Sequence, residues 1–149
     1  MIMAKYRFID DLTSDVMFEA HGKTLPQLFA NAAEAMFSVI CQLEKIEPKE
    51  SRPVTVEAES AEKLVVAWLQ NLIGMVDTEE MFFSGFDVQS VKEIRDHAPD
   101  KQVWQLKAQV HGEPITPEKG ETVVKAVTNY GFKFEKGKDG YKVTVSLDI

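Results

Sequence analysis

The last nine residues of the chain, Tyr141 to Ile149, alternate strictly between apolar and polar side chains. A period of two is typical of a strand that buries one face and exposes the other. Gly137 to Gly140 precede this run and predict a hairpin turn that leads into it. An ordered strand here would hold Asp148 and the α-carboxylate of Ile149 side by side, and two such carboxylates repel unless a cation or a shared proton compensates them.

Two stretches carry apolar residues at the three- and four-residue spacing that predicts amphipathic helices. The first begins after Thr24, where the run Thr-Leu-Pro-Gln is a capping box, and it reaches Ile40. The second begins after Ser60, a good N-cap residue, and reaches Val76. Trp68 falls inside the second apolar stripe, so we expect it in the core rather than on a binding surface.

Alternating or short apolar runs predict strands in most of the remaining chain. They cover residues 5–9, 16–21, 53–59, 81–83, 86–94, 103–112, 122–128 and 132–134. The alternation slips near Val91, which predicts a bulge. Early elements alternate between strand and helix, and later ones read as antiparallel strands. This order predicts one α+β domain over residues 1–149, with two main helices packed on a mixed or antiparallel β-sheet.

Composition narrows the class of protein. A chain of 149 residues that is 44% hydrophobic suits one domain with a real core. Its 24 acids and 17 bases give a net charge of −7, with the bases scattered along the sequence, which argues against a broad nucleic-acid surface. Cys41 is the single cysteine, lies among apolar residues, and predicts a buried thiol rather than a disulfide or metal cluster. No signal peptide or membrane span is evident, so we expect a cytoplasmic protein.

The acidic turn between the first two predicted strands is a candidate site. No glycine-rich phosphate loop, nucleophile elbow or paired-histidine helix motif occurs. Asp10, Asp11 and Asp15 fall in this turn, where carboxylates and backbone carbonyls can converge on a hard cation. For Asp10 the simpler interpretation is that its side chain caps the turn. For Asp11 and Asp15, capping and cation binding both remain open.

Lys125 is a second candidate. It lies between Val124 and Ala126 in the predicted strand 122–128, on the same face as Val123 and Val127. The stem would then pack among apolar groups, and the ammonium group would need a partner. A structural ion pair and a functional lysine near the acidic site are both compatible with this position.

Motifs spread over the whole chain resemble those of the archease family, and they occur in the same order. The matching stretches are YRFIDDLTSDV (6–16), GKTL with LFANAA (22–25 and 28–33), VAWLQNL (66–72), VKAVTNY (124–130) and LDI (147–149). Two departures stand out: Leu12 replaces a histidine of the family's opening motif, and residues 117–121 lack a histidine often found there. If those histidines tune the site or contact a partner, this member would bind metal differently or be less active.

The resemblance implies a cytosolic protein that activates an RtcB-type RNA ligase in tRNA splicing, promoting ligase guanylylation and multiple turnover without being an enzyme itself. It implies a divalent-cation site formed by Asp15, Asp148 and Ile149, with Asp11 as a neighbour, and a functionally important Lys125. The expected cation is calcium, with magnesium or manganese as alternatives, and the oxygen-only ligands favour calcium or magnesium over zinc.

The expected partner is therefore the ligase, with neither strong direct nucleic-acid binding nor a membrane. Two other functions stay open. One is a metal-dependent hydrolase that uses cation-bound water, and the other is a chaperone-like interaction domain with solvated acids.

Overall fold

The computed structural model describes residues 4–9, 15–95 and 101–149, whose strands form two antiparallel sheets. The four-stranded sheet has the order β1 (Tyr6–Ile9), β2 (Val16–Gly22), β7 (Gly140–Asp148), β6 (Ala126–Gly137). The three-stranded sheet has the order β3 (Glu50–Ala58), β5 (Val103–Pro114), β4 (Met81–Ile94). The α+β class is confirmed. The strands expected in one mixed or antiparallel sheet divide between two sheets, a division that side-chain alternation does not encode.

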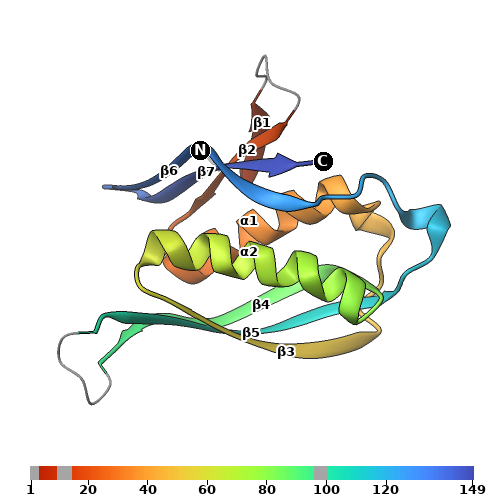
Figure 1. The fold of residues 1–149 in the computed structure, drawn as a ribbon, viewed down its shortest axis with the longest axis horizontal. Coiled ribbons are helices and arrows are strands. Elements are labelled where there is room, and N and C mark those ends of the chain that lie inside the picture. Colours follow the sequence, from red (N-terminus) through yellow and green to blue (C-terminus); the bar gives the residue numbers. More distant parts are fainter. Residues whose placement is uncertain (1–3, 10–14, 96–100) are drawn as a thin grey trace.

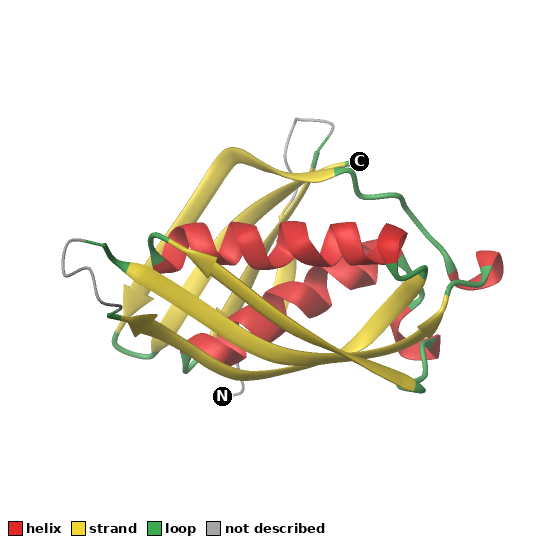
Figure 2. Ribbon diagram, turned by 60° about the horizontal axis from the view of Figure 1, so that its bottom comes forward, coloured by secondary structure: helices red, strands yellow, loops and turns green. Residues whose placement is uncertain are grey.

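The two helices, α1 (Leu25–Ile40) and α2 (Ala61–Thr78), lie between the two sheets (Figures 1 and 2). α1 contacts β2 and β7 of one sheet and β4 of the other, whereas α2 contacts β3, β4 and β5 on one side and β6 on the other. The alanines at 32, 33 and 35 of α1 are fully buried, and such small residues let strands approach the helix from several directions. Each helix therefore holds the two sheets together.

Local sequence signals account for where the helices begin. The Thr24 hydroxyl accepts a hydrogen bond from the Gln27 backbone N–H (3.3 Å), and the Gln27 side chain accepts one from the Lys23 backbone N–H (3.0 Å). Ser60 caps α2 by accepting from the Lys63 N–H at 3.1 Å. Trp68 is fully buried, and its indole N–H donates to the Phe29 carbonyl at 2.9 Å. The predicted caps and the core position of Trp68 are confirmed.

The long strands β4 and β5 pair with two register shifts, one between Phe83 and Gly85 and one between Val88 and Ser90. The second shift lies close to Val91, where the sequence predicted a bulge. β5 continues to Pro114, further than predicted, and the following loop contains the short 3₁₀ helix η2 (Pro117–Lys119). A similar turn, η1 (Leu43–Lys45), follows α1.

The start of β6 differs from the prediction for 122–128. Residues 121–125 have no regular structure, because the Glu121 and Thr122 N–H groups donate to the carbonyls of Ile40 and Val39 at the end of α1 instead of to a strand. Val124 is buried, but Val123 is 78% exposed and Lys125 is exposed as well. The expectation that the Lys125 stem packs among apolar side chains is therefore wrong.

Cys41 is buried directly after α1, as predicted. Burial, with the nearby acids Glu44 and Glu121, raises the pKa of its thiol to about 12. The thiol therefore stays protonated and unreactive at neutral pH. In the described part of the chain, neither helix combines the length and apolarity that crossing a bilayer requires.

Candidate functional site

The pairing of β2 with β7 brings distant candidate residues to one end of the four-stranded sheet. Val16 lies opposite Leu147, so the next position along the two strands holds Asp15 and Asp148. On the other side of β7, Ala126 lies opposite Asp148, and the Lys125 N–H donates to the Asp148 carbonyl at 2.7 Å. We call Asp15, Lys125, Asp148 and Ile149 the acidic tip.

The alternation along β7 decides which way the tip carboxylates point. Leu147 is fully buried against the helices, so Asp148 lies on the opposite face of the sheet, together with Ser146 and Thr144. Asp15 and Asp148 are half-buried, and Ile149 is 40% exposed. Side chains directly opposite on antiparallel strands have Cβ atoms roughly 4.5–5.5 Å apart, a distance at which like charges are destabilising. Such a pair is stabilised when a cation or a proton lies between the carboxylates.

The described residues of the acidic tip supply some of the ligands that a hard cation needs. Within residues 4–9, 15–95 and 101–149, no three His, Cys, Asp or Glu side chains gather closely enough to hold a metal ion. Asp15 and Asp148 supply two carboxylates, and the terminal carboxylate of residue 149 is a third candidate donor. Asp11 lies outside the described residues, as do Asp10 and Leu12. The donors are all oxygens, which suit calcium or magnesium better than zinc.

Two residues that sequence analysis did not single out, Gln70 and Ser146, hold the strands at the tip. The Gln70 side chain on α2 accepts a hydrogen bond from the Val127 N–H at 3.1 Å and so holds the start of strand β6. The Ser146 hydroxyl donates to the Tyr130 carbonyl at 2.8 Å, and Ser146 is fully buried. These hydrogen bonds join α2, β6 and β7, and only a tertiary fold reveals them, because each links residues far apart in sequence.

An irregular segment of β6 covers part of the outer face of the sheet beside the tip. The register shifts between Thr128 and Lys133. Within this segment Gly131 has a φ of 64°, and a Cβ on it would lie 2.8 Å from the Met17 side chain. This irregular segment therefore packs on β2 and shields the strand residues next to the acidic tip, while Tyr130 itself is half exposed.

Comparison with known proteins gives the family. The model of the Archease protein family matches residues 6–149. The chain belongs to the archease family. It is 35% identical to the protein archease of Methanosarcina acetivorans over 147 residues, covering 97% of this chain and 96% of that protein. It is also 35% identical to the protein archease of Sulfurisphaera tokodaii over 149 residues, covering 99% of this chain and 100% of that protein.

A solved structure of similar fold supports the same conclusion. The solution structure of Methanobacterium thermoautotrophicum protein 1598 matches with a TM-score of 0.79 and 30% sequence identity. The match covers 99% of this chain and 100% of that one. Both the archease resemblance and the α+β class are therefore confirmed over nearly the whole chain.

One of the two departures from the archease motifs falls on a described segment. The stretch 117–121, which lacks the family histidine, contains η2 over its first three residues. Lys119 anchors this turn through an ion pair of 2.6 Å with Glu113, whose side chain is only 5% exposed. Lys119 and the Glu47 N–H outweigh the effect of burial and keep the pKa of Glu113 below its usual range. In this archease-family member, the segment before Lys125 is thus held by a lysine–glutamate pair.

Proposed function

We propose that this protein is a non-catalytic activator of an RtcB-type RNA ligase in tRNA splicing, and that it promotes guanylylation and multiple turnover of the ligase. The observation that carries the proposal is the strand register that sets Asp15, Asp148 and Lys125 at one end of the four-stranded sheet. Membership of the archease family supports it. The partner is the ligase, and the site of action is the cytoplasm.

The acidic tip is the part of the surface that we assign to the ligase. The Lys125 backbone is fixed by its hydrogen bond to Asp148, while its side chain is exposed and free to reach a partner. A cationic side chain beside paired carboxylates can select a partner by charge complementarity. This arrangement favours a protein-binding tip, because Lys125 offers an exposed charge from a fixed backbone position.

We further propose that a divalent cation, calcium or else magnesium or manganese, binds at the tip through Asp15, Asp148 and the terminal carboxylate of Ile149, with Asp11 nearby. The repulsion expected between opposed carboxylates is the physical reason. When bound, the cation would neutralise the tip and fix its ligands. Lys125 would then present its ammonium group from a rigid backbone position.

Ligation assays with the cognate ligase test the activator function. Asp148→Asn keeps the shape of the side chain and removes its charge. We expect activation to fall by about 100-fold, because loss of a proposed ligand should cost at least as much as the largest typical loss for a residue that only supports a ligand. Asp87→Asn is the matched control, because Asp87 is an exposed acid on β4 of the other sheet, and it should activate like the wild type. Equal activation by wild type and Asp148→Asn would contradict the proposal.

The same preparations distinguish an activator from a hydrolase. An activator alone should leave phosphoester substrates unchanged, with or without calcium or manganese. Turnover by the purified protein that a chelator abolishes would favour the hydrolase and overturn our proposal.

A further inference from the structure

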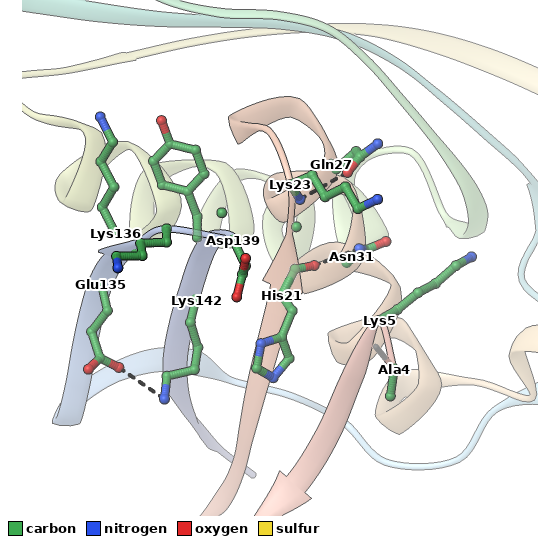
Figure 3. Close-up of a pocket in the computed structure, with 15 residues that line it drawn as sticks. Ala4, Lys5, His21, Lys23, Gln27, Asn31, Glu135, Lys136, Asp139 and Lys142 are labelled. Atoms are coloured by element: carbon green, nitrogen blue, oxygen red, sulfur yellow. Dashed lines mark hydrogen bonds and ion pairs between the residues drawn. The ribbon is translucent and has the colours of Figure 1, made fainter. Parts of the chain in front are cut away.

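A wide cleft lies at the opposite end of the four-stranded sheet from the acidic tip. It has a volume of about 990 Å³ and is bordered by the end of β2, the start of α1 and the β6–β7 hairpin. Its cationic lining residues are Lys5, Lys23, Lys136, Lys138 and Lys142. We call it the lysine cleft. Figure 3 shows Lys136 and Lys142 on one side and Lys5 and Lys23 on the other, with His21 and Asp139 between them.

The charge of the lysine cleft is opposite to that of the whole protein. Its lining holds five of the chain's 17 lysines and arginines but only two of its 24 acids, Glu135 and Asp139. Five cations less two acids leave a local charge of +3, in a chain with a net charge of −7. The fold therefore gathers bases that are scattered in the sequence into one local basic patch.

Three of these lysines have no acidic partner within the described residues. Lys5 pairs with Glu34 at 3.3 Å, and Lys142 pairs with Glu135 at 3.3 Å. Lys23 and Lys138 make no ion pair in that part of the chain, and the Lys136 ammonium lies 5.9 Å from the centre of the Tyr141 ring. Uncompensated ammonium groups around one cleft raise the local concentration of anions.

The walls of the lysine cleft are held in place by close backbone packing. A Cβ on Gly140, whose φ is 127°, would lie 2.4 Å from the Gly22 carbonyl oxygen, so the start of β7 is pressed against the end of β2. The Asn31 side chain donates to the His21 carbonyl at 2.7 Å and ties the same end of β2 to α1. The lysines thus project from a fixed frame.

We propose that the lysine cleft binds the phosphodiester backbone of RNA, weakly and without regard to base sequence. The choice of RNA rests on the proposed function, because an activator of an RNA ligase works beside that polyanion. The cleft and the acidic tip are separated by the length of β2, roughly 20 Å at about 3.3 Å per residue. That separation would let the tip contact the ligase while the cleft holds a flanking part of the same RNA.

The chemistry of the lining favours phosphates over the carboxylates of an acidic protein. All five cationic residues are lysines, whose ammonium groups act as mobile point charges. The bidentate pairing that favours carboxylates requires the planar guanidinium group of arginine. Lysines on an open rim suit successive phosphates of varied geometry. Acidic residues elsewhere on the protein repel the RNA phosphates and keep the binding weak. At 0.15 M salt this repulsion is screened beyond about 8 Å.

Fluorescence anisotropy with a labelled single-stranded oligoribonucleotide tests this inference without any ligase. Three phosphate contacts, one for each lysine without an acidic partner, predict an affinity loss of about 20-fold between 50 and 200 mM salt. Lys136→Gln with Lys138→Gln removes two exposed charges from the rim and should reduce that loss to about threefold. At 50 mM salt, the same variant should bind roughly tenfold more weakly than the wild type.

The matched control is Lys92→Gln with Lys107→Gln, which removes the same charge from exposed positions on β4 and β5. It should bind RNA like the wild type. Equal weakening in both double variants would overturn the inference, as would preferential binding of polyglutamate of the same length, which would instead indicate an acidic protein. If the wild type binds RNA as expected but does not activate the ligase, that result would count against the proposed function alone.

Discussion

The two ends of the four-stranded sheet differ in charge although the same two strands, β2 and β7, connect them. At one end these strands bring together Asp15 and Asp148. At the other end they place His21 opposite Lys142 and Gly22 opposite Tyr141, on the floor of the lysine cleft. One sheet thus presents an acidic surface and a basic surface in opposite directions.

A charged network lies between the two ends and faces away from the helices. The Glu19 side chain is only 10% exposed and contacts Arg7 at 3.1 Å, His21 at 3.0 Å and Lys142 at 3.9 Å. Burial alone would raise the pKa of Glu19, but the Arg7 hydrogen bonds and the charge of Lys142 outweigh it and hold this pKa below its usual value. Glu19 therefore joins three strands by charge at the middle of the sheet.

The largest effect that we predict is on the free energy of unfolding when a glycine at either end of the sheet is replaced by alanine. Gly140→Ala would force a Cβ against the backbone of Gly22, in a conformation that other residues rarely adopt, and should cost about 2–4 kcal/mol in the free energy of unfolding. Gly131→Ala near the tip meets only the end of the flexible Met17 side chain and should cost about 1–2 kcal/mol. Urea denaturation measures both, and equal losses would mean that the cleft end is not rigidly packed.

A smaller effect is expected at the centre of the sheet. Glu19→Gln removes the shared carboxylate and should lower the free energy of unfolding by about 1–3 kcal/mol at pH 7, whereas the exposed Glu135→Gln should cost under about 1 kcal/mol. Because the folded-state pKa of Glu19 is depressed, its contribution is present above the unfolded-state value of about 4.3 and disappears as the pH falls through the folded-state pKa. The stability gap between wild type and Glu19→Gln should therefore close on acidification, and a constant gap from pH 7 to pH 3 would argue against the network.

The smallest stability effect concerns a tip lysine, where we expect a functional change instead. The Lys125 side chain is exposed and has no ion pair with any described residue, so Lys125→Ala should change the free energy of unfolding by less than about 0.5 kcal/mol. The same variant should lose about tenfold in ligase activation if its ammonium group contacts the partner. A clear loss of stability with normal activation would assign Lys125 to the structure rather than to the tip's function.

The sequence alone predicted the elements that depend on local patterns. The caps at Thr24 and Ser60, the terminal strand and the buried Trp68 follow from spacing and side-chain type, and all are confirmed. The predicted start of β6 was wrong, because the residues before it are hydrogen-bonded to the end of α1. That contact is long-range and leaves no local signal in the sequence.

The two ends of the sheet differ in the same way. The residues of the acidic tip stand out in three short motifs, so sequence analysis identified them. The strand register then shows that Asp15, Asp148 and Lys125 lie at the same end of the sheet. The lysine cleft combines residues from three separate segments, around Lys5, Lys23 and the β6–β7 hairpin. No spacing rule links these positions, because only the packing of α1 and the hairpin against β2 brings them together.

Calcium titration by calorimetry tests the tip most directly, using wild type, Asp15→Asn, Asp148→Asn, a form extended beyond Ile149, and Asp139→Asn. Asp139→Asn removes the same charge as the tip variants, but from the other end of the sheet. We predict calcium binding by the wild type and by Asp139→Asn, and an affinity about tenfold or more weaker in the other three. Equal binding by all five proteins, or none by the wild type, would contradict a cation site at the tip.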